Sequence, residues 1–430
     1  MKGLVGPSRV RVLWLTTNPL PAVALRQGMP AAFGCGWQSA ALAALSAEAA
    51  DVQFVCAARP SQTVAPFESS GIQYVSLEPR RSQDGLRRAY QSWMAGLVST
   101  PPVEEMKRLI EDVRPDIIHV HGTETSDALA VLLAAPETPI LVTLQGLVSE
   151  IAPLTLAGLR RADIFEDVCS LKFARGRGLV HESRHMRKAA AMELAALRRA
   201  RDVSGRTDWD RGVVRRANPA ARYWHIDEAL RQPFHEVVWR GPTEGAPTIL
   251  AVTSDAPRKG VDVLLRGFAK VRSRRPCALK VVGGVVGTPV WRSLSRLESS
   301  LGLTGHVDWV GGQSAESVAR MLSECTVFVC ASRIENSPNS VCEAMLVGVP
   351  VVASRVGGMQ SLVNSGEDGL LFESGDDEAL ARTIELVASD ELLASRLGDR
   401  ARARASVRHD PAAVSRRTLD VYASLVGEAT

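Results

Sequence analysis

The chain has 430 residues, 46% of them hydrophobic and 23% charged, which is ordinary for a globular protein of two or three domains. Its 51 basic and 47 acidic side chains leave a net charge of +4, too small to favour a nucleic-acid binder. No apolar run is long enough to cross a bilayer, and the N-terminal apolar stretch is too short for a secretory signal. Seven cysteines without a Cys-x-x-Cys pair argue against a disulfide framework or a zinc site, so we expect reduced thiols in a cytoplasmic protein.

In the N-terminal half, short apolar runs alternate with longer stretches of helical periodicity. Buried strands are predicted at RVLWLT (11–16), VQFVC (52–56), IQYVSL (72–77), DIIHVH (116–121) and ILVTL (140–144). Helices between buried strands indicate a parallel sheet with right-handed crossovers. An arginine-rich stretch with few signs of strands follows at 153–232. It predicts a helical excursion or an acceptor-facing element, although such arginines most often form a solvated face.

A second series of apolar runs predicts a second sheet. Its strands are expected at TILAVT (248–253), ALKVVG (278–283), HVDWV (306–310), TVFVC (326–330) and PVVAS (350–354). Together the two series predict an α/β protein with two doubly wound, Rossmann-like domains that face each other across a cleft. We place an N-terminal domain at 1–236, a C-terminal domain at 237–408 and, over 409–430, a helix that crosses back to the N-terminal domain. Ligands of such sheets bind at the carboxyl ends of the strands, so the site is expected in the cleft.

Candidate ligand contacts in the N-terminal domain lie where predicted strands end. Gly34 and Gly36, between the first strand and its helix, would let the backbone approach a ligand closely. His119 and His121 share one face of their strand because side chains alternate. We expect His119 to be buried and hydrogen-bonded, and His121, at the carboxyl end, to be functional. Gln145 follows the next strand and is placed to hydrogen-bond a hydroxyl group.

Basic residues follow the first strand of the second series. Arg258, Lys259 and Gly260 lie on a loop between that strand and an amphipathic helix. Two cations on such a loop suit a diphosphate. The alternative is a helix that happens to begin with basic residues.

The segment RIENSPNSVCEAMLVGVPVVAS (333–354) predicts the start of a helix. Ser337 is expected to cap the helix and Pro338 to occupy its first turn. The amides of Asn339 and Ser340 would then be free at the helix N-terminus. Free amides and the helix dipole favour an anion, phosphate above all.

Two glutamates flank this predicted anion site. Glu335 precedes the cap, and Glu343 falls one turn inside the helix. Carboxylates are poor ligands for phosphate but good acceptors for hydroxyl groups. The stretch therefore suits a molecule that carries both groups, such as a sugar nucleotide. The alternative is a capped helix with two surface glutamates.

The motifs of other cofactor sites are not found. There is no Gly-x-Gly-x-x-Gly after the first strand, which argues against a dinucleotide cofactor, and there is no P-loop. We also find no Asp-x-Asp triplet that would hold a metal against a diphosphate. Neither a cofactor nor a metal ion is therefore expected.

These motifs together resemble a known family, the family-4 glycosyltransferases of GT-B fold. The strongest match is the Glu-x7-Glu motif from Glu335 to Glu343, which continues through EAMLVGVPVVASRVGGMQSLVNSGEDGLLF (343–372). RKG at 258–260 matches the diphosphate-binding step, and 307–332 also follows the family. The resemblance covers the whole C-terminal half. The N-terminal half is similar more loosely, through PDIIHVHGTE (115–124) and the glycine turn before Trp37.

The resemblance implies a retaining sugar transfer from a nucleotide-sugar donor. By that resemblance, Arg258 and Lys259 neutralise the diphosphate, and Glu343 holds the ribose hydroxyls. Glu335 contacts the transferred sugar, and His121 faces it from the N-terminal domain. The residues expected to take part in catalysis are Glu335, His121 and Lys259, and those expected to bind the donor are Arg258, Lys259, Gly260, Asn339, Ser340 and Glu343. Gly34, Gly36 and Gln145 are expected to contact the acceptor or the sugar.

The chain departs from the family pattern at two strand ends. Thr253–Asp255 stands where many members carry an arginine, so the diphosphate contacts are in doubt. Gln145 precedes Gly146 where many members have His-Gly. These departures keep open a second function, a GT-B protein that has lost turnover and acts as a binding or scaffold partner. Another enzyme on the same fold, such as a phosphorylase or an epimerase, is the other alternative considered.

A membrane contact is one further hypothesis. The segment GLRRAYQSWMAGLV (85–98) places Leu86, Tyr90, Trp93 and Leu97 on one helical face with arginines nearby. Such a helix could rest on an anionic membrane beside a lipid-linked acceptor. We favour the alternative, a helix packed on the domain core.

Overall fold

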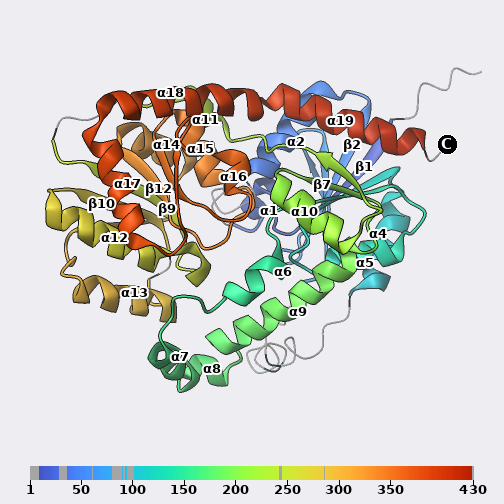
Figure 1. Cartoon of the computed structure of the whole chain (residues 1–430). Helices are drawn as coiled ribbons and strands as arrows, with labels where there is room; N and C mark the ends of the chain where they lie inside the picture. The colour runs from blue at the N-terminus through green and yellow to red at the C-terminus, as the bar shows by residue number, and fades with distance from the viewer. Residues whose placement is uncertain are drawn as a thin grey trace, which may run out of the picture.

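The computed structural model describes residues 9–28, 36–60, 62–79, 90, 93, 101–241, 245–284 and 286–428. These residues form two α/β domains that stand next to each other, each with a sheet between layers of helices (Figure 1). The predicted fold class is confirmed. All ten predicted strands are present, because strands of a parallel sheet that are buried on both faces appear as apolar runs in the sequence.

The N-terminal domain is built on an eight-stranded sheet in the order β3-β4-β2-β1-β5-β6-β7-β8. Neighbouring strands pair in parallel, except that β3 pairs antiparallel with β4. The strands are β1 Val10–Thr16, β2 Val52–Ala58, β3 Phe67–Ser69, β4 Ile72–Ser76, β5 Ile117–His121, β6 Ile140–Thr143, β7 Asp202–Gly205 and β8 Arg222–His225. The described helices of this half are α1 Pro21–Arg26, α2 Gly36–Glu48, α4 Val103–Val113, α5 Asp127–Ala134, α6 Val148–Ile151, α7 Arg161–Val168, α8 Leu171–Ala174, α9 Leu179–Leu197 and α10 Asp208–Ala217, with the 3₁₀ turn η1 Ala152–Leu154.

The C-terminal domain is built on a six-stranded parallel sheet in the order β11-β10-β9-β12-β13-β14. Its strands are β9 Thr248–Thr253, β10 Ala278–Gly283, β11 Val307–Gly311, β12 Val327–Cys330, β13 Val351–Ser354 and β14 Leu370–Phe372. Its helices are α11 Gln232–Glu236, α12 Val261–Arg274, α13 Pro289–Ser300, α14 Ala315–Glu324, α15 Asn339–Val347, α16 Met359–Leu362, α17 Asp377–Ser389 and α18 Glu391–Arg408, with the 3₁₀ turn η2 Pro257–Lys259.

The arginine-rich stretch at 153–232 is only partly helical, contrary to the expectation of few strands. It contains α7, α8 and α9, but β7 and β8 then extend the first sheet by two strands. Each of these strands has only four residues and carries polar side chains, so no apolar run marks it. Arg222 of β8 neutralises the buried Asp202 of β7 across the ladder, with Nε 2.8 Å from Oδ1. Burial of a charge requires such a partner.

The last helix, α19 Pro411–Gly427, packs on α2 of the N-terminal domain. In Figure 1 it continues α18 along one edge of the molecule, from the C-terminal domain to the N-terminal domain. Its Tyr422 is buried against the first sheet. The Tyr422 hydroxyl accepts a hydrogen bond from Trp14 Nε1 at 2.9 Å and lies 2.5 Å from His119 Nδ1. The end of the chain is thus part of the core behind β1 and β5.

The excursion also reaches the C-terminal domain. Helix α7 lies beside α13, and its Asp163 accepts hydrogen bonds from Ser293 and from Arg296, both at 2.8 Å. The connection through 153–168 therefore forms a bridge between the domains away from the linker that follows β8.

Most of the predicted membrane helix at 85–98 lies outside the described residues, including Leu86 and Leu97. Tyr90 is exposed, whereas Trp93 donates a hydrogen bond from Nε1 to the Ala174 carbonyl at 2.9 Å and touches the ring of His181. Trp93 is therefore docked on α8 and α9. No helix in the described part of the chain is both long and apolar enough to span a membrane.

Candidate active site

A cleft of 710 Å³ separates the two domains, and the carboxyl ends of strands from both sheets open into it. On the N-terminal side, the wall is formed by residues after β5, β6 and β7. On the other side, it is formed by the end of β9, the turn η2 and the loop from β12 into α15. The residues that line it are Gly36, Trp37, Glu124, Gln145, Gly146, Leu147, Val148, Ile151, Met186, Arg206, Trp209, Arg231, Val252, Thr253, Ser254, Arg258, Lys259, Ile334, Glu335, Asn336, Ser337, Pro338, Asn339, Ser340 and Glu343.

Lys259 and Glu335 are brought into contact at the centre of the C-terminal wall. Lys259 Nζ lies 2.5 Å from Glu335 Oε1, and the Ser332 hydroxyl donates to the same oxygen at 2.7 Å. Gly260 ends the turn at φ +65°, and a Cβ there would stand 1.9 Å from the Ala331 carbonyl oxygen. Only glycine allows η2 to press against the strand end and direct Lys259 toward Glu335.

The neighbouring cation, Arg258, also lines the cleft. Within the described chain, no carboxylate forms an ion pair with it. Burial raises the pKa of the nearby Glu182, and the charge of Arg258 opposes this rise, but with no described carboxylate at ion-pair distance the guanidinium is available to an anionic ligand. The residues that depart from the family pattern, Thr253–Asp255, lie beside Arg258. Thr253 and Ser254 line the cleft, whereas Asp255 faces a smaller, separate cavity and accepts a hydrogen bond from Thr288.

Helix α15 begins at Asn339, and its N-cap position is Pro338 rather than the expected Ser337. Ser337 does not cap the helix, because its side chain lies against the buried carboxylate of Glu228, to which its hydroxyl donates. The amides of Asn339 and Ser340 donate to no described residue. They are free at the N-terminus of a nine-residue helix, where an anion is stabilised.

Glu343 is buried on α15 and forms an ion pair with Arg231, whose Nη2 lies 2.7 Å from Glu343 Oε1. Burial raises the pKa of the Glu343 carboxyl, and the charge of Arg231 opposes this rise. Arg231 lies on the linker between the domains and was not predicted. Nothing in its local sequence distinguishes it from the many other arginines of this segment.

His121 is not brought to the cleft with the others. Its ring is 2% exposed and packs between the rings of Trp14 and His119, with centroids 4.0 and 3.8 Å away. Trp37, which lines the cleft, meets it edge-on. Neither ring nitrogen has a hydrogen-bond partner among the residues that the structure describes, and burial lowers the pKa of His121 well below its usual value. His121 is therefore a neutral ring one layer behind the cleft wall.

The expectation for His119 is confirmed, because both of its ring nitrogens have partners, Tyr422 on one side and Thr143 on the other. Gln145 lines the cleft, but its side-chain amide donates to the His121 carbonyl at 2.9 Å. Gly36 lies at the start of α2, where a Cβ would stand 2.7 Å from Arg231 Cδ. Gly34 lies outside the described residues.

Two further polar residues of the N-terminal wall were not predicted. Glu124 lies within the quoted stretch 115–124, but we assigned it no role. Arg206 directly follows β7, in the segment GRTDWDRG (205–212), and lines the cleft with its guanidinium buried. The same stretch holds an Asp-x-Asp triplet at 208–210 that we had not considered. Its Asp210 completes the capping box of α10, whose N-cap is Thr207, and accepts hydrogen bonds from the backbone amides of Arg206 and Thr207.

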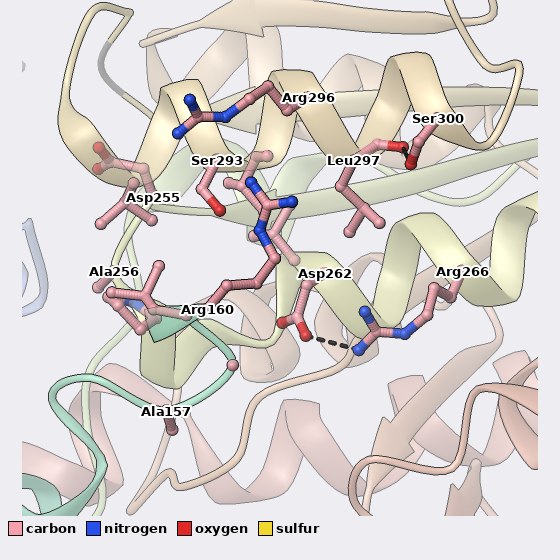
Figure 2. Close-up of a pocket in the computed structure, with 16 residues that line it drawn as sticks. Ala157, Arg160, Asp255, Ala256, Asp262, Arg266, Ser293, Arg296, Leu297 and Ser300 are labelled. Atoms are coloured by element: carbon pink, nitrogen blue, oxygen red, sulfur yellow. Dashed lines mark hydrogen bonds and ion pairs between the residues drawn. The ribbon is translucent and has the colours of Figure 1, made fainter. Parts of the chain in front are cut away.

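A second, smaller cavity of 150 Å³ lies between the excursion and helices α12 and α13. Figure 2 shows Arg160, Arg266 and Arg296 around it, with Asp262 and Asp255. Each of these cations is already paired. Arg266 Nη2 lies 2.6 Å from Asp262 Oδ2, and both Arg160 and Arg296 contact Asp163. This cavity is therefore part of the bridge between the domains rather than a site with charge left to bind a ligand.

The geometry agrees with the matches to known proteins. Residues 239–404 match the family described as glycosyl transferases group 1, and residues 33–226 match the glycosyl transferase 4-like domain. The chain belongs to these glycosyltransferases. The family resemblance predicted from its motifs is confirmed.

Curated relatives match part of this glycosyltransferase chain. D-inositol 3-phosphate glycosyltransferase of Nocardioides sp. is 34% identical over 199 residues, which are 42% of this chain and 42% of the relative. The GDP-mannose-dependent alpha-(1-6)-phosphatidylinositol monomannoside mannosyltransferase of Mycolicibacterium smegmatis is 31% identical over 35% of this chain and 41% of that enzyme. The chain thus spans about two fifths of the length of these relatives.

Solved structures match the glycosyltransferase over almost its whole length. Sucrose-phosphate synthase from Thermosynechococcus elongatus has a TM-score of 0.71 at 21% identity, over 98% of this chain and 100% of that one. Anabaena HepE in complex with UDP and glucose has a TM-score of 0.65 at 16% identity, over 96% and 100%. At these identities the likeness establishes the fold, the two-domain GT-B architecture.

Proposed function

We propose that the protein is a retaining glycosyltransferase that moves a sugar from a nucleotide-diphosphate donor to a hydroxyl of a saccharide, glycolipid or small-molecule acceptor. The reaction would need no metal ion and would serve bacterial polysaccharide or glycoconjugate biosynthesis on the cytoplasmic side of the membrane. One observation carries this proposal. Lys259 and Glu335 touch beside the free N-terminus of α15, in a cleft lined by both domains.

The donor is proposed to lie along the C-terminal wall. Its diphosphate would meet Arg258, Lys259 and the free amides of α15, which together supply positive potential without a metal. The ribose hydroxyls would donate to Glu343, whose pKa burial raises and the charge of Arg231 holds down. Among similar proteins, one relative is GDP-mannose-dependent and HepE was solved in complex with UDP, so guanine and uracil nucleotides are the first donors to test.

The chemical step is proposed as a substitution on one face of the sugar. The bond from the anomeric carbon to the diphosphate oxygen breaks, and the acceptor hydroxyl oxygen bonds to the same face. The acceptor proton passes to the leaving phosphate oxygen, so no side chain has to take it. Negative charge grows on the leaving group, and Arg258 and Lys259 stabilise it there. Glu335 holds the sugar and lies against the developing positive charge of the ring.

The N-terminal wall would present the acceptor. Asn336 joins it to the C-terminal wall, because its side-chain amide donates to the Gln145 carbonyl at 3.0 Å and accepts from Thr207 Oγ1 at 2.8 Å. The contact stands next to Glu335 and keeps the cleft narrow, which limits water near the donor. A sugar contact from His121 would require Trp37 to move, so the proposed step gives it no part.

A non-catalytic scaffold is the second candidate, because Thr253–Asp255 lacks the arginine of many family members. The pairing of Lys259 with Glu335 and of Arg231 with Glu343 opposes it. In each pair a partly buried cation favours the ionised carboxylate, the form that accepts hydrogen bonds from hydroxyl groups. A scaffold would have no need of these pairs in its cleft.

Calorimetric titration with UDP, GDP and ADP, each with a chelator present, tests the proposal. We expect one nucleotide to bind, and Lys259→Ala to weaken its binding by about 100-fold, since a charge-assisted contact to phosphate is lost. Lys107→Ala is the matched control, because Lys107 is an exposed lysine of α4, paired with Glu104 and outside the cleft lining. Failure of all three nucleotides to bind would favour the scaffold. Binding that needs a divalent ion would refute the metal-free site.

A further inference from the structure

Two polar groups on the N-terminal wall of the cleft are buried without a hydrogen-bond partner in the described chain. They are Oε2 of Glu124 and the Nε and Nη2 atoms of Arg206. Both residues line the 710 Å³ cleft, and Arg206 is only 3% exposed. Buried polar atoms are nearly always hydrogen-bonded, and guanidinium donors left without an acceptor are especially costly. Two such groups in one cleft wall indicate that a ligand completes them.

The two side chains are held in place from behind. Glu124 Oε1 accepts a hydrogen bond from the Gly146 amide at 2.8 Å, which leaves Oε2 free. Gly122 makes room for this carboxyl group, because a Cβ there would stand 2.1 Å from Oε2. Arg206 lies flat on the ring of Trp37, with Cζ 4.1 Å from the ring centroid. Neither group has to reorganise before it binds.

Arg206 is neutralised but is not hydrogen-bonded by its acidic neighbour. Its Nε lies 3.7 Å from Glu228 Oε2, too far for a hydrogen bond. The other oxygen of Glu228 accepts from Ser337 and from the Cys342 thiol. The guanidinium therefore keeps donors for another oxygen anion, and its planar geometry matches a carboxylate or a phosphate.

Glu124 suits a hydroxyl group. Burial raises the pKa of its carboxyl to about 7, against the opposing effects of the Gly146 amide and the Arg206 charge, while the nearby Glu193 raises it further. Near neutral pH the group is thus present in both protonation states. It can accept a hydrogen bond from a hydroxyl or donate one to an acidic oxygen.

Both groups lie next to the proposed sugar position. Asn336, which follows Glu335 in the chain, bonds to the carbonyl of Gln145 and to the hydroxyl of Thr207. Gln145 precedes Gly146, the partner of Glu124, and Thr207 follows Arg206. One residue thus connects Glu335 to the surroundings of both groups. The position is that of an acceptor, across the cleft from the donor wall.

From this arrangement we propose that Arg206 and Glu124 form an acceptor subsite for a sugar or cyclitol that carries a carboxylate or phosphate group. Arg206 takes the acidic group, and Glu124 orients a hydroxyl of the same molecule. The inference rests on the proposed function and narrows it to acidic acceptors.

The test compares acceptors that differ only in the acidic group. Glucose is set against glucose 6-phosphate and glucuronic acid, and inositol against inositol phosphate, by calorimetry on protein saturated with the nucleotide that it binds. We expect an acidic member to bind at least about 10-fold more tightly than its neutral partner, the effect of one hydrogen-bonded charge. Carboxylate and phosphate probes distinguish the two sources of charge.

The variants Arg206→Gln and Arg206→Lys separate binding from folding. We expect Arg206→Gln to abolish the preference for the acidic probe and Arg206→Lys to keep part of it, with nucleotide binding unchanged in both. Arg211→Gln is the matched control, because Arg211 lies on the ring of Tyr223 on the same segment but does not line the cleft. It should keep the full preference.

Several results would overturn the subsite. Equal binding of acidic and neutral probes, no binding of any acidic probe, or an unchanged preference in Arg206→Gln would each do so while nucleotide binding persists. Loss of nucleotide binding by the unaltered protein would instead refute the proposed function itself.

Discussion

Arg231 and Glu343 join the interdomain linker to the helix that opens the donor site. Nη2 and Nε of Arg231 lie 2.7 and 3.2 Å from the same carboxylate oxygen of Glu343. Glu343 is buried, whereas Arg231 is about one-third exposed. A linker residue therefore opposes the rise in pKa of the carboxylate proposed to bind ribose. We expect donor binding to depend on this pair.

Removal of Arg231 should make nucleotide binding depend more strongly on pH. Arg231 opposes the rise that burial causes in the pKa of Glu343, so Arg231→Met raises this pKa further. At about pH 6 more of the carboxyl is then protonated and accepts ribose hydroxyls poorly. We expect about a 10-fold loss of affinity there and a smaller loss at about pH 8.5, in line with one pKa unit per factor of ten.

Titration calorimetry at the two pH values measures this effect. Arg240→Met is the control, because Arg240 is an exposed linker arginine paired with Glu324 outside the cleft. A loss in Arg231→Met that is equal at both pH values would show that the pair acts through packing rather than through charge.

Glu335→Gln should separate donor binding from sugar transfer. The amide keeps the shape of the side chain but removes the charge that faces the sugar and pairs with Lys259. Lys259 is then more available to the diphosphate, so affinity for the nucleoside diphosphate should stay level or rise. Turnover should fall by about 100-fold or more, the usual effect of removing an electrostatic group from a transition state. If nucleotide affinity falls as far as turnover does, Glu335 belongs to the diphosphate site instead.

The residues of the C-terminal cleft wall could be located from the sequence because they follow predicted strands or lie in the first turns of the helix after one. Lys259 follows β9, and Glu335 follows the adjacent strand β12, so the sheet order brings them together. Glu343 falls one helical turn after Asn339, which needs only the helix period. The strands were also predictable, because strands that are buried on both faces of a parallel sheet appear as apolar runs in the sequence.

The N-terminal wall was not predictable in the same way. Arg206 and Arg231 come from an arginine-rich stretch in which composition cannot tell a buried cation from a solvated one. Their positions depend on β7, which has a polar sequence, and on a linker that folds back over α15. His121 was placed at the correct strand end, but the bulk of Trp37 in front of it is a tertiary effect. The predicted N-cap at Ser337 was wrong for a similar reason, because its hydroxyl donates to Glu228, which is distant in the sequence.

Glu228 should make the fold sensitive to acid. It is fully buried, and burial disfavours its charged form, but Arg206, His409 and Arg408 outweigh this and hold its pKa to about 2. A carboxyl with a lowered folded-state pKa stabilises the protein above its unfolded pKa, near 4.5, and the contribution is lost as pH falls toward 2. The free energy of unfolding should therefore decline between about pH 5 and about pH 2.

Glu228→Gln tests this account by denaturant unfolding. It leaves Arg206 without its buried countercharge, whereas Arg408 keeps its ion pair with Asp227, so we expect a loss of about 3–5 kcal/mol at neutral pH and a shallower decline in acid. Glu373→Gln is the control, because Glu373 is an exposed glutamate that pairs with Arg355. An acid decline as steep in Glu228→Gln as in the unaltered protein would mean that other carboxylates cause it.

Asp163 should hold the excursion to the C-terminal domain. It is buried on α7, and hydrogen bonds from Arg160, followed by that from Ser293, lower its pKa to about 2. Its bond to Arg296 of α13 crosses the domain boundary. Asp163→Asn keeps the shape but removes the charge, so α7 and α8 should detach more often. We expect trypsin to cut after the exposed basic residues of 172–177 about 10-fold faster, because the locally opened state should be about 10-fold more populated.

Glu166→Gln provides the comparison for this prediction. Glu166 also contacts Arg296 at 2.8 Å, but it is about half exposed, and exposed pairs contribute little. Its cleavage rate should stay within about 2-fold of the unaltered protein, because an exposed pair adds at most a fraction of a kcal/mol. If both variants are cut equally fast, the bridge depends on Arg296 and general charge rather than on the buried carboxylate. If neither changes, apolar packing of α7 on α13 holds the domains together without Asp163.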